Sequence, residues 1–140
     1  MDDIKSLVTR TYETWNAHDR DGFLACFNDD AEFKGPGGLA AQGTDAGRTF
    51  WSIWQDAFPD CQVTINLVVA EGNNAYEEAV FSGTHTEVLH TPTSGDIPPT
   101  GKSVAVPYML GLTYRDGKFS SFRLIFDQVE LMTQLGLAPS

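Results

Sequence analysis

The chain has 140 residues, with 19 acidic against 9 basic side chains and a formal net charge of −10. A chain of this length forms one domain that buries about two-thirds of the surface its unfolded form exposes, so the sequence predicts a single domain over residues 1–140. The negative charge argues against nucleic acid and anionic membranes as partners, because both kinds of binding depend on lysine and arginine.

The first segment predicts an amphipathic helix followed by a shorter one. Apolar side chains recur at helical spacing near the N-terminus, at Ile4, Leu7, Val8, Tyr12 and Trp15. Asp2 or Asp3 is the expected N-cap. After the polar break NAHDRDG, a second helix is expected to carry Phe23, Leu24, Cys26 and Phe27 before the loop GPGG. The two helices would form a hairpin.

The run TDAGRTFWSIWQDAF predicts a third helix. Thr44 is its expected N-cap, and Pro59 stops it because proline cannot continue a helix. Its expected apolar face consists of Phe50, Ile53, Trp54 and Phe58.

Beyond this helix the pattern changes to an alternation typical of β-strands. It runs through CQVTINLVVAEGNNAYEEAVFSGTHTEVL and through KSVAVPYMLGLTYRDGKFSSFRLIFD, where Asp-Gly is a strong hairpin signal. The last segment, DQVELMTQLG, predicts a short helix with Asp127 and Glu130 spaced as a capping box and Gly136 at its end. Helices that precede a curved antiparallel sheet give an α+β domain with the helices packed on one face.

Two features of the sequence suggest a bound phosphate or metal, but neither has the residues that such a site needs. GDIPPTGKS contains the Gly-Lys-Ser of a phosphate-binding loop, but Asp96 stands where the first glycine is needed, and Pro98 and Pro99 remove backbone donors. Cys26 and Cys61 lie in apolar contexts without a CxxC or His-Cys cluster, so no metal site is predicted.

The acidic N-terminus differs from a basic, apolar leader, and no run approaches the ~18 apolar residues of a membrane span, which predicts a cytoplasmic protein.

Five segments, taken in order, resemble the SnoaL-like polyketide cyclase and ester cyclase family: WQDAFPD, FSGTHTEVL, IPPTGKSV, RDGKF and FDQVELMTQLGL. The resemblance covers nearly the whole chain. It implies the fold of nuclear transport factor 2 and ketosteroid isomerase, in which a cone-shaped antiparallel sheet is wrapped by helices around a deep apolar pocket. The alternating strands and the absence of metal motifs predict activity that needs no cofactor or metal.

The resemblance implies two catalytic residues. In the family's cyclases the aspartate at the position of Asp127 is the acid/base catalyst of an intramolecular aldol closure, so Asp127 would remove a proton α to a carbonyl. His85, which shares strand parity with Phe81 and Gly83, would lie in the cavity as a hydrogen-bond donor, and Gly83 would leave room for a ligand. Structural interpretations stay open, with Asp127 as a helix cap and His85 as a core histidine.

A further carboxylate is unexplained. Glu77 occupies a strand position where apolar residues are usual, and a buried carboxylate needs a partner. It either pairs with Arg123, which alternation places on the same strand face as Asp127, or serves as a second acid/base group. A tight pairing of Arg123 with Asp127 would reduce the basicity of Asp127.

The predicted function is that of a cofactor-independent cyclase, isomerase or lyase acting on a small apolar or aromatic carbonyl compound. The expected substrate contacts are Tyr12, Trp15, Phe50, Trp54, Phe81, Tyr108 and Arg123. A homodimer is expected through the outer sheet face, where the apolar residues would be Tyr76, Val80, Leu124 and Phe126. The alternatives are a non-catalytic ligand-binding or structural dimer and, less favoured, an epoxide hydrolase, for which only Arg123 and Asp127 are evident.

Overall fold

The computed structural model describes residues 2–91 and 95–137. Its helices are α1 (Asp2–Asn16), α2 (Arg20–Leu24), the 3₁₀ turn η1 (Pro36–Gly38), α3 (Asp45–Gln55) and α4 (Gln128–Gln134). Its strands are β1 (Phe27–Lys34), β2 (Ala40–Gln42), β3 (Gln62–Glu71), β4 (Asn74–Thr84), β5 (Leu89–Thr91), β6 (Gly95–Ile97), β7 (Ser103–Arg115) and β8 (Lys118–Phe126).

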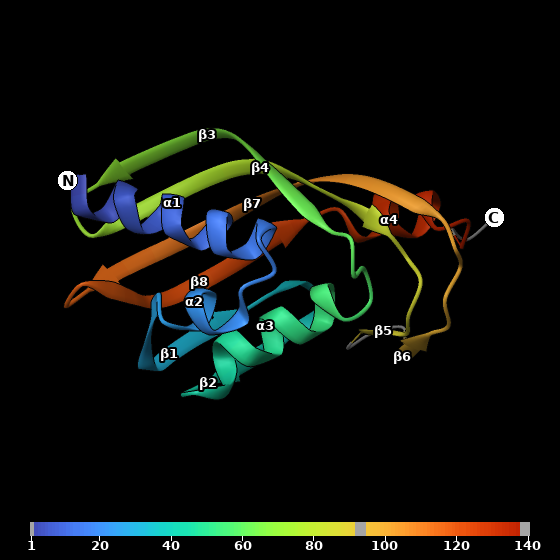
Figure 1. The fold of residues 1–140 in the computed structure, drawn as a ribbon, viewed down its shortest axis with the longest axis horizontal. Helices are drawn as coiled ribbons and strands as arrows, with labels where there is room; N and C mark the ends of the chain where they lie inside the picture. The colour runs from blue at the N-terminus through green and yellow to red at the C-terminus, as the bar shows by residue number, and fades with distance from the viewer. Residues whose placement is uncertain (1, 92–94, 138–140) are drawn as a thin grey trace.

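Six of the strands form one curved sheet in the order β2-β1-β8-β7-β4-β3, and β5 pairs with β6 in a separate hairpin. The helices α1, α2 and α3 lie over one side of the sheet, while α4 and the β5–β6 hairpin stand together at one end of the molecule (Figure 1). This confirms the predicted α+β class with helices on one face. One pairing departs from the expected antiparallel sheet, because β1 runs parallel to β8.

The core lies between the helices and the inner face of the sheet. Trp15 of α1 meets Phe50 of α3 with ring centroids 5.3 Å apart, and Phe50 meets Phe122 of β8 at 5.4 Å in an edge-to-face arrangement. Each fully buried aromatic or aliphatic side chain of this size contributes about 1.5–3 kcal/mol to folding. Cys26 and Cys61 are unpaired and buried in this core, and burial raises the pKa of their thiols to about 11 and about 12.

Several elements differ from the sequence prediction. The expected second helix ends at Leu24, and Phe27 begins β1, a strand that its polar Asn-Asp-Asp stretch conceals. A register shift between Phe27 and Glu32 lets this stretch pass out of regular pairing with β8. Thr44 stands at the N-terminus of α3 but makes no side-chain cap. The segment around Asp96, expected only as a connection, forms the β5–β6 hairpin.

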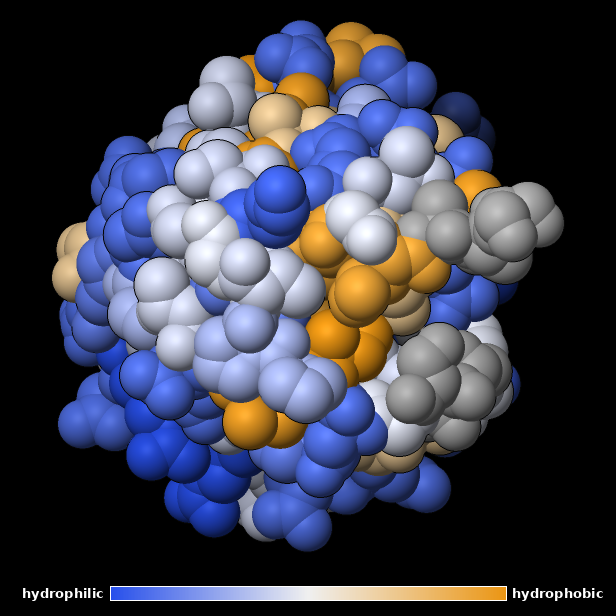
Figure 2. Space-filling view, turned by 90° about the vertical axis from the view of Figure 1, so that its right-hand side faces the viewer, coloured by the Kyte–Doolittle hydropathy of each residue, from blue (hydrophilic) through white to orange (hydrophobic). Residues whose placement is uncertain are grey.

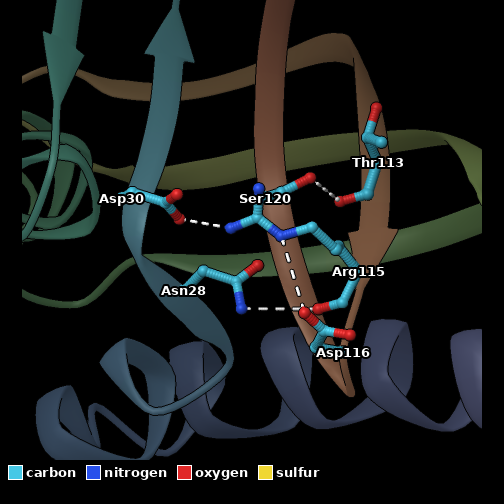
Figure 3. Close-up of polar contacts among 6 residues, drawn as sticks. All are labelled: Asn28, Asp30, Thr113, Arg115, Asp116 and Ser120. Carbon is cyan, nitrogen blue, oxygen red and sulfur yellow. Dashed lines mark hydrogen bonds and ion pairs between the residues drawn. The ribbon is translucent and has the colours of Figure 1, made fainter.

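Polar contacts hold β1 against the turn between β7 and β8. The Arg115 guanidinium contacts the Asp30 carboxylate, and the Asn28 side-chain amide donates to the Arg115 carbonyl oxygen over 3.3 Å (Figure 3). Between β7 and β8 themselves, the Ser120 hydroxyl donates to the Thr113 carbonyl over 3.2 Å. These bonds fasten the parallel β1–β8 pair at the end where its register shifts.

Across residues 2–91 and 95–137, no helix is at once long enough and apolar enough to span a lipid bilayer.

Candidate functional site

A small cavity, here called the inner cavity, lies between α1, α3 and the inner face of the sheet. It encloses about 60 Å³ of free space. Its walls are almost entirely apolar: Thr11, Tyr12, Trp15, Phe23, Phe27, Phe50, Trp54, Val63, Glu77, Phe81, Val106, Tyr108, Leu110, Leu112, Phe122, Leu124, Phe126 and Leu131. Strand alternation explains which strand residues line the cavity, since every second residue of β4, β7 and β8 points to this face.

Glu77 is the one carboxylate in this apolar wall. It lies on β4 between the inward-facing Ala75 and Ala79, and only 3% of its surface is exposed. Within the described part of the chain, its Oε2 atom is buried without a hydrogen-bond partner. Burial raises the pKa of Glu77 from an ordinary 4.5 to about 7. The group therefore exchanges its proton near neutral pH.

The ion pair expected between Glu77 and Arg123 does not form. Arg123 lies on β8 between the inward-facing Phe122 and Leu124, so alternation directs it to the outer face, where it is exposed. Glu77 faces the cavity on the other side of the same sheet. The predicted pairing of Glu77 with Arg123 is therefore wrong. Arg123 lines neither this cavity nor the groove described below.

Tyr108 shares the cavity with Glu77. It lies on β7 opposite Ala79, while Glu77 lies opposite Leu110, so the two side chains are diagonal neighbours on the inner face. Burial raises the pKa of Tyr108 well above its usual value, and the negative charge of Glu77 raises it further. The phenol thus keeps its proton and can act as a hydrogen-bond donor.

A larger hollow, here called the outer groove, opens at the end of the molecule formed by α3, α4 and the β5–β6 hairpin. It has a volume of about 570 Å³. Its lining is Pro36, Leu39, Ile53, Trp54, Leu89, His90, Thr91, Asp96, Ile97, Pro98, Phe126, Gln128, Val129, Leu131, Met132 and Leu137. Figure 2 shows an apolar area on this face, bordered by hydrophilic side chains. Trp54, Phe126 and Leu131 line both hollows, so the groove adjoins the cavity.

Most of the expected substrate contacts lie in the inner cavity. The residues concerned are Tyr12, Trp15, Phe50, Trp54, Phe81 and Tyr108. The exception among those named from the sequence is Arg123, for the reason given above. Contact of any of them with a substrate stays a prediction.

Asp127 does not open into the cavity. It is exposed and caps α4, where its Oδ1 atom accepts from the backbone N–H groups of Val129 at 3.0 Å and Glu130 at 3.1 Å. Neither the cavity nor the groove includes it, although Phe126 before it and Gln128 after it line the groove. The prediction that Asp127 and His85 open into one pocket is therefore wrong, because the Asp127 side chain is turned toward the end of α4, which it caps.

His85 is fully buried but lines neither hollow. β4 ends at Thr84, so the strand parity with Phe81 does not extend to His85. The Thr100 backbone N–H donates to its Nδ1 over 3.2 Å, which places the ring proton on Nε2, and its ring lies 5.3 Å from that of Phe58. Burial lowers the pKa of His85. This geometry favours a neutral core histidine.

Gly83 allows close packing of the chain on itself. A Cβ at this position would lie 3.1 Å from Phe58 Cβ and 3.2 Å from Cys61 Cα. The expectation that Gly83 leaves room for a ligand is therefore wrong, because the segment after α3 fills that space.

Within residues 2–91 and 95–137, no three His, Cys, Asp or Glu side chains lie close enough together to hold a metal ion.

Comparisons with known proteins agree with this architecture. The sequence profile of the SnoaL-like domain matches residues 8–122. A solved structure of a candidate SnoaL-like polyketide cyclase from Jannaschia sp. CCS1 is 26% identical, with a TM-score of 0.83 over 99% of this chain and 94% of that one. No curated protein matches.

Two further solved structures are similar in fold. IdmH, a candidate polyketide cyclase from Streptomyces antibioticus, is 24% identical, with a TM-score of 0.76 over 94% of this chain and 97% of that one. A protein with a ketosteroid isomerase-like fold from Catenulispora acidiphila, solved with trimethylamine, is 19% identical, with a TM-score of 0.75 over 95% of this chain and 93% of that one.

Proposed function

The chain belongs to the SnoaL-like domain family, and from this premise we propose that it is a cofactor-independent enzyme in which Glu77 transfers a proton on a small apolar carbonyl compound. The reaction would be an aldol-type ring closure or an isomerisation. Names of similar proteins point to cyclases, and the fold is that of ketosteroid isomerase-like proteins. The choice of Glu77 comes from the cavity of this chain.

The observation that carries the proposal is a buried, unpartnered carboxylate in an apolar cavity. Leaving such a group unpaired costs folding free energy, so its presence needs a reason other than stability. A general base works best when its pKa lies near the operating pH, and burial raises that of Glu77 to about 7. Both properties fit a group that takes up and returns a proton during catalysis.

The proposed steps conserve every atom. The Glu77 carboxylate removes a proton from the carbon α to the substrate carbonyl, and the electron pair of that C–H bond forms an enolate. The Tyr108 hydroxyl donates a hydrogen bond to the enolate oxygen, where negative charge develops. In a ring closure the enolate carbon then attacks a second carbonyl of the same molecule, and Glu77 returns its proton to the new alkoxide. In an isomerisation Glu77 returns the proton to a different carbon.

The aromatic walls would assist by excluding water. The enolate and the carboxylate interact with their neighbours more strongly in an apolar cavity than in water. Trp15, Phe50 and Trp54 also offer flat apolar surfaces to an aromatic or unsaturated substrate.

The roles that the family resemblance implies for Asp127 and His85 compete with this proposal. Asp127 is exposed at a helix cap, and His85 lies outside both hollows. Glu77 is favoured because its carboxylate borders the cavity itself. The non-catalytic alternative, a ligand-binding dimer, would use this carboxylate only to hold a ligand and would not accelerate exchange of an α-proton.

The proposal is tested without knowledge of the product. Apolar ketones are incubated with the protein in D₂O, and loss of the α-proton signal is followed by NMR. We expect the protein to accelerate exchange for at least one ketone, and Glu77→Gln to lower that rate about 10²–10⁴-fold. Glu78→Gln is the matched control, because Glu78 adjoins Glu77 in the chain but is exposed on the outer face.

Two results would overturn the proposal. One is a Glu77→Gln protein that folds normally and exchanges the α-proton as fast as the parent protein. The other is an equal loss in Glu77→Gln and Glu78→Gln, which would point to a general effect of removing charge.

A further inference from the structure

The two hollows differ greatly in size. The inner cavity offers about 60 Å³ against about 570 Å³ in the outer groove. The cavity is therefore much the smaller of the two, and a long substrate would extend beyond it.

The groove lies beside the cavity and shares part of its wall. Trp54 from α3, Phe126 from the end of β8 and Leu131 from α4 border both hollows. The rings of Trp54 and Phe126 meet edge to face with centroids 5.4 Å apart. A molecule that reached from Glu77 into the groove would have to pass between these three side chains.

The walls of the groove are held in place by contacts elsewhere in the fold. Gln134 of α4 forms two hydrogen bonds with the backbone of Ala105 on β7, at 2.7 and 2.9 Å. In the β5–β6 hairpin, Leu89 and Ile97 are paired across the strands and buried. The groove is therefore preformed, so that a ligand need not order its walls on binding.

The β5–β6 hairpin adds one polar site to this apolar lining. His90 Nδ1 and Asp96 Oδ1 lie 2.6 Å apart across the hairpin, and both side chains are largely exposed. Together they offer a ring nitrogen and a carboxylate, which suits a hydroxyl group that both donates and accepts. An anionic group is disfavoured, because Asp96 and the net charge of −10 would repel it.

We propose that the outer groove and the inner cavity form one bipartite site, which selects elongated uncharged ketones with an apolar body and a hydroxyl group at the far end. This inference rests on the proposed function for the placement of the carbonyl beside Glu77. The body of the molecule lies against Ile53, Val129 and Met132 in the groove, and its hydroxyl reaches the His90–Asp96 pair.

Binding is measured on the Glu77→Gln protein, so that no turnover interferes. The probes are 2-butanone, 2-decanone and 10-hydroxy-2-decanone, and affinity is taken from NMR chemical-shift titrations. Each CH₂ group that becomes buried should tighten binding by about fourfold. We therefore expect 2-decanone to bind at least about tenfold more tightly than 2-butanone, and the hydroxylated probe to bind more tightly still.

Variants locate the effect in the groove. Val129 is exposed on α4 and borders the groove, so Val129→Asp places a charge in its apolar wall without disturbing the core. This change should weaken 2-decanone at least about tenfold and 2-butanone less than about twofold. Leu67→Asp is the matched control, since Leu67 is an exposed apolar residue on the outer sheet face, and it should change neither affinity. His90→Ala should remove the advantage of the hydroxylated probe over 2-decanone.

The results separate this inference from the proposed function. Length-dependent binding that Val129→Asp abolishes supports the bipartite site even if Glu77→Gln leaves proton exchange intact, which would refute only the catalytic proposal. Absence of 2-decanone binding, an affinity independent of chain length, or equal weakening of both ketones by Val129→Asp would each overturn the bipartite site.

Discussion

The buried carboxylate of Glu77 should make the stability of the protein depend on pH in a way that one substitution removes. Its pKa is raised from 4.5 to about 7 in the folded chain. The unfolded chain therefore releases this proton at lower pH than the folded chain does. As pH rises from 4.5 to 7, the titration of Glu77 progressively lowers the free energy of unfolding. Above pH 7 this contribution no longer changes with pH.

The size of the effect follows from the pKa difference. The difference between a pKa of 4.5 and one of about 7, at about 1.36 kcal/mol for each pKa unit, corresponds to about 3 kcal/mol of unfolding free energy. Glutamine has nearly the same shape and no charge to lose. Glu77→Gln should therefore gain about 3 kcal/mol relative to the parent protein between pH 4.5 and pH 8.

The assay is urea unfolding of both proteins at the two pH values, with the free energies obtained by linear extrapolation. Comparing the difference between the proteins at each pH cancels the titration of all other groups. Glu78→Gln, which changes an exposed carboxylate on the same strand, should show almost no such difference. A change below about 1 kcal/mol for Glu77→Gln, or one of opposite sign, would show that Glu77 is paired or solvated in the folded protein.

Three further predictions concern packing, assembly and cofactors. Gly83→Ala should destabilise the protein by about 1–3 kcal/mol in urea unfolding, because the new methyl group would lie 3.1 Å from Phe58 Cβ, and an unchanged midpoint would contradict this packing. The outer sheet face exposes Leu67, Val69, Tyr76, Met109 and Ile125, so light scattering at micromolar concentration should give the mass of two chains, and the mass of one chain would count against a homodimer. Exchange of the α-proton should survive extensive EDTA treatment, whereas loss of the activity and its return with a divalent ion would reveal a metal requirement.

The alternating strands made much of the fold predictable. The hairpins around EGNN and RDGK appear where expected, joining β3 to β4 and β7 to β8. Strand β1 was missed because its polar residues Asn28, Asp29 and Asp30 resemble a turn, and it is recognisable as a strand only through its pairing with β8. Partners that lie far away in the sequence leave no local pattern to read.

The site was predicted only in part, because alternation gives two faces of a strand but not which one lies inside. The prediction that Leu124 and Phe126 lie on the outer sheet face is wrong, because both line the inner cavity together with Phe122. The family resemblance instead drew attention to the opposite face, with Arg123 and Asp127, and so to the wrong side of the strand. Glu77 was noticed from the sequence as a misplaced carboxylate, but the absence of a partner becomes visible only in the structure.

The most direct test of the central claim compares Glu77→Gln with Asp127→Asn for α-proton exchange on the same ketone in D₂O. Asparagine keeps a side-chain oxygen that can cap α4, so Asp127→Asn should fold with a loss of about 1 kcal/mol or less. We predict that Asp127→Asn retains most of the exchange rate and that Glu77→Gln loses about 10²–10⁴-fold. A stable Asp127→Asn protein without activity, beside an active Glu77→Gln protein, would contradict the account and return the acid/base role to Asp127.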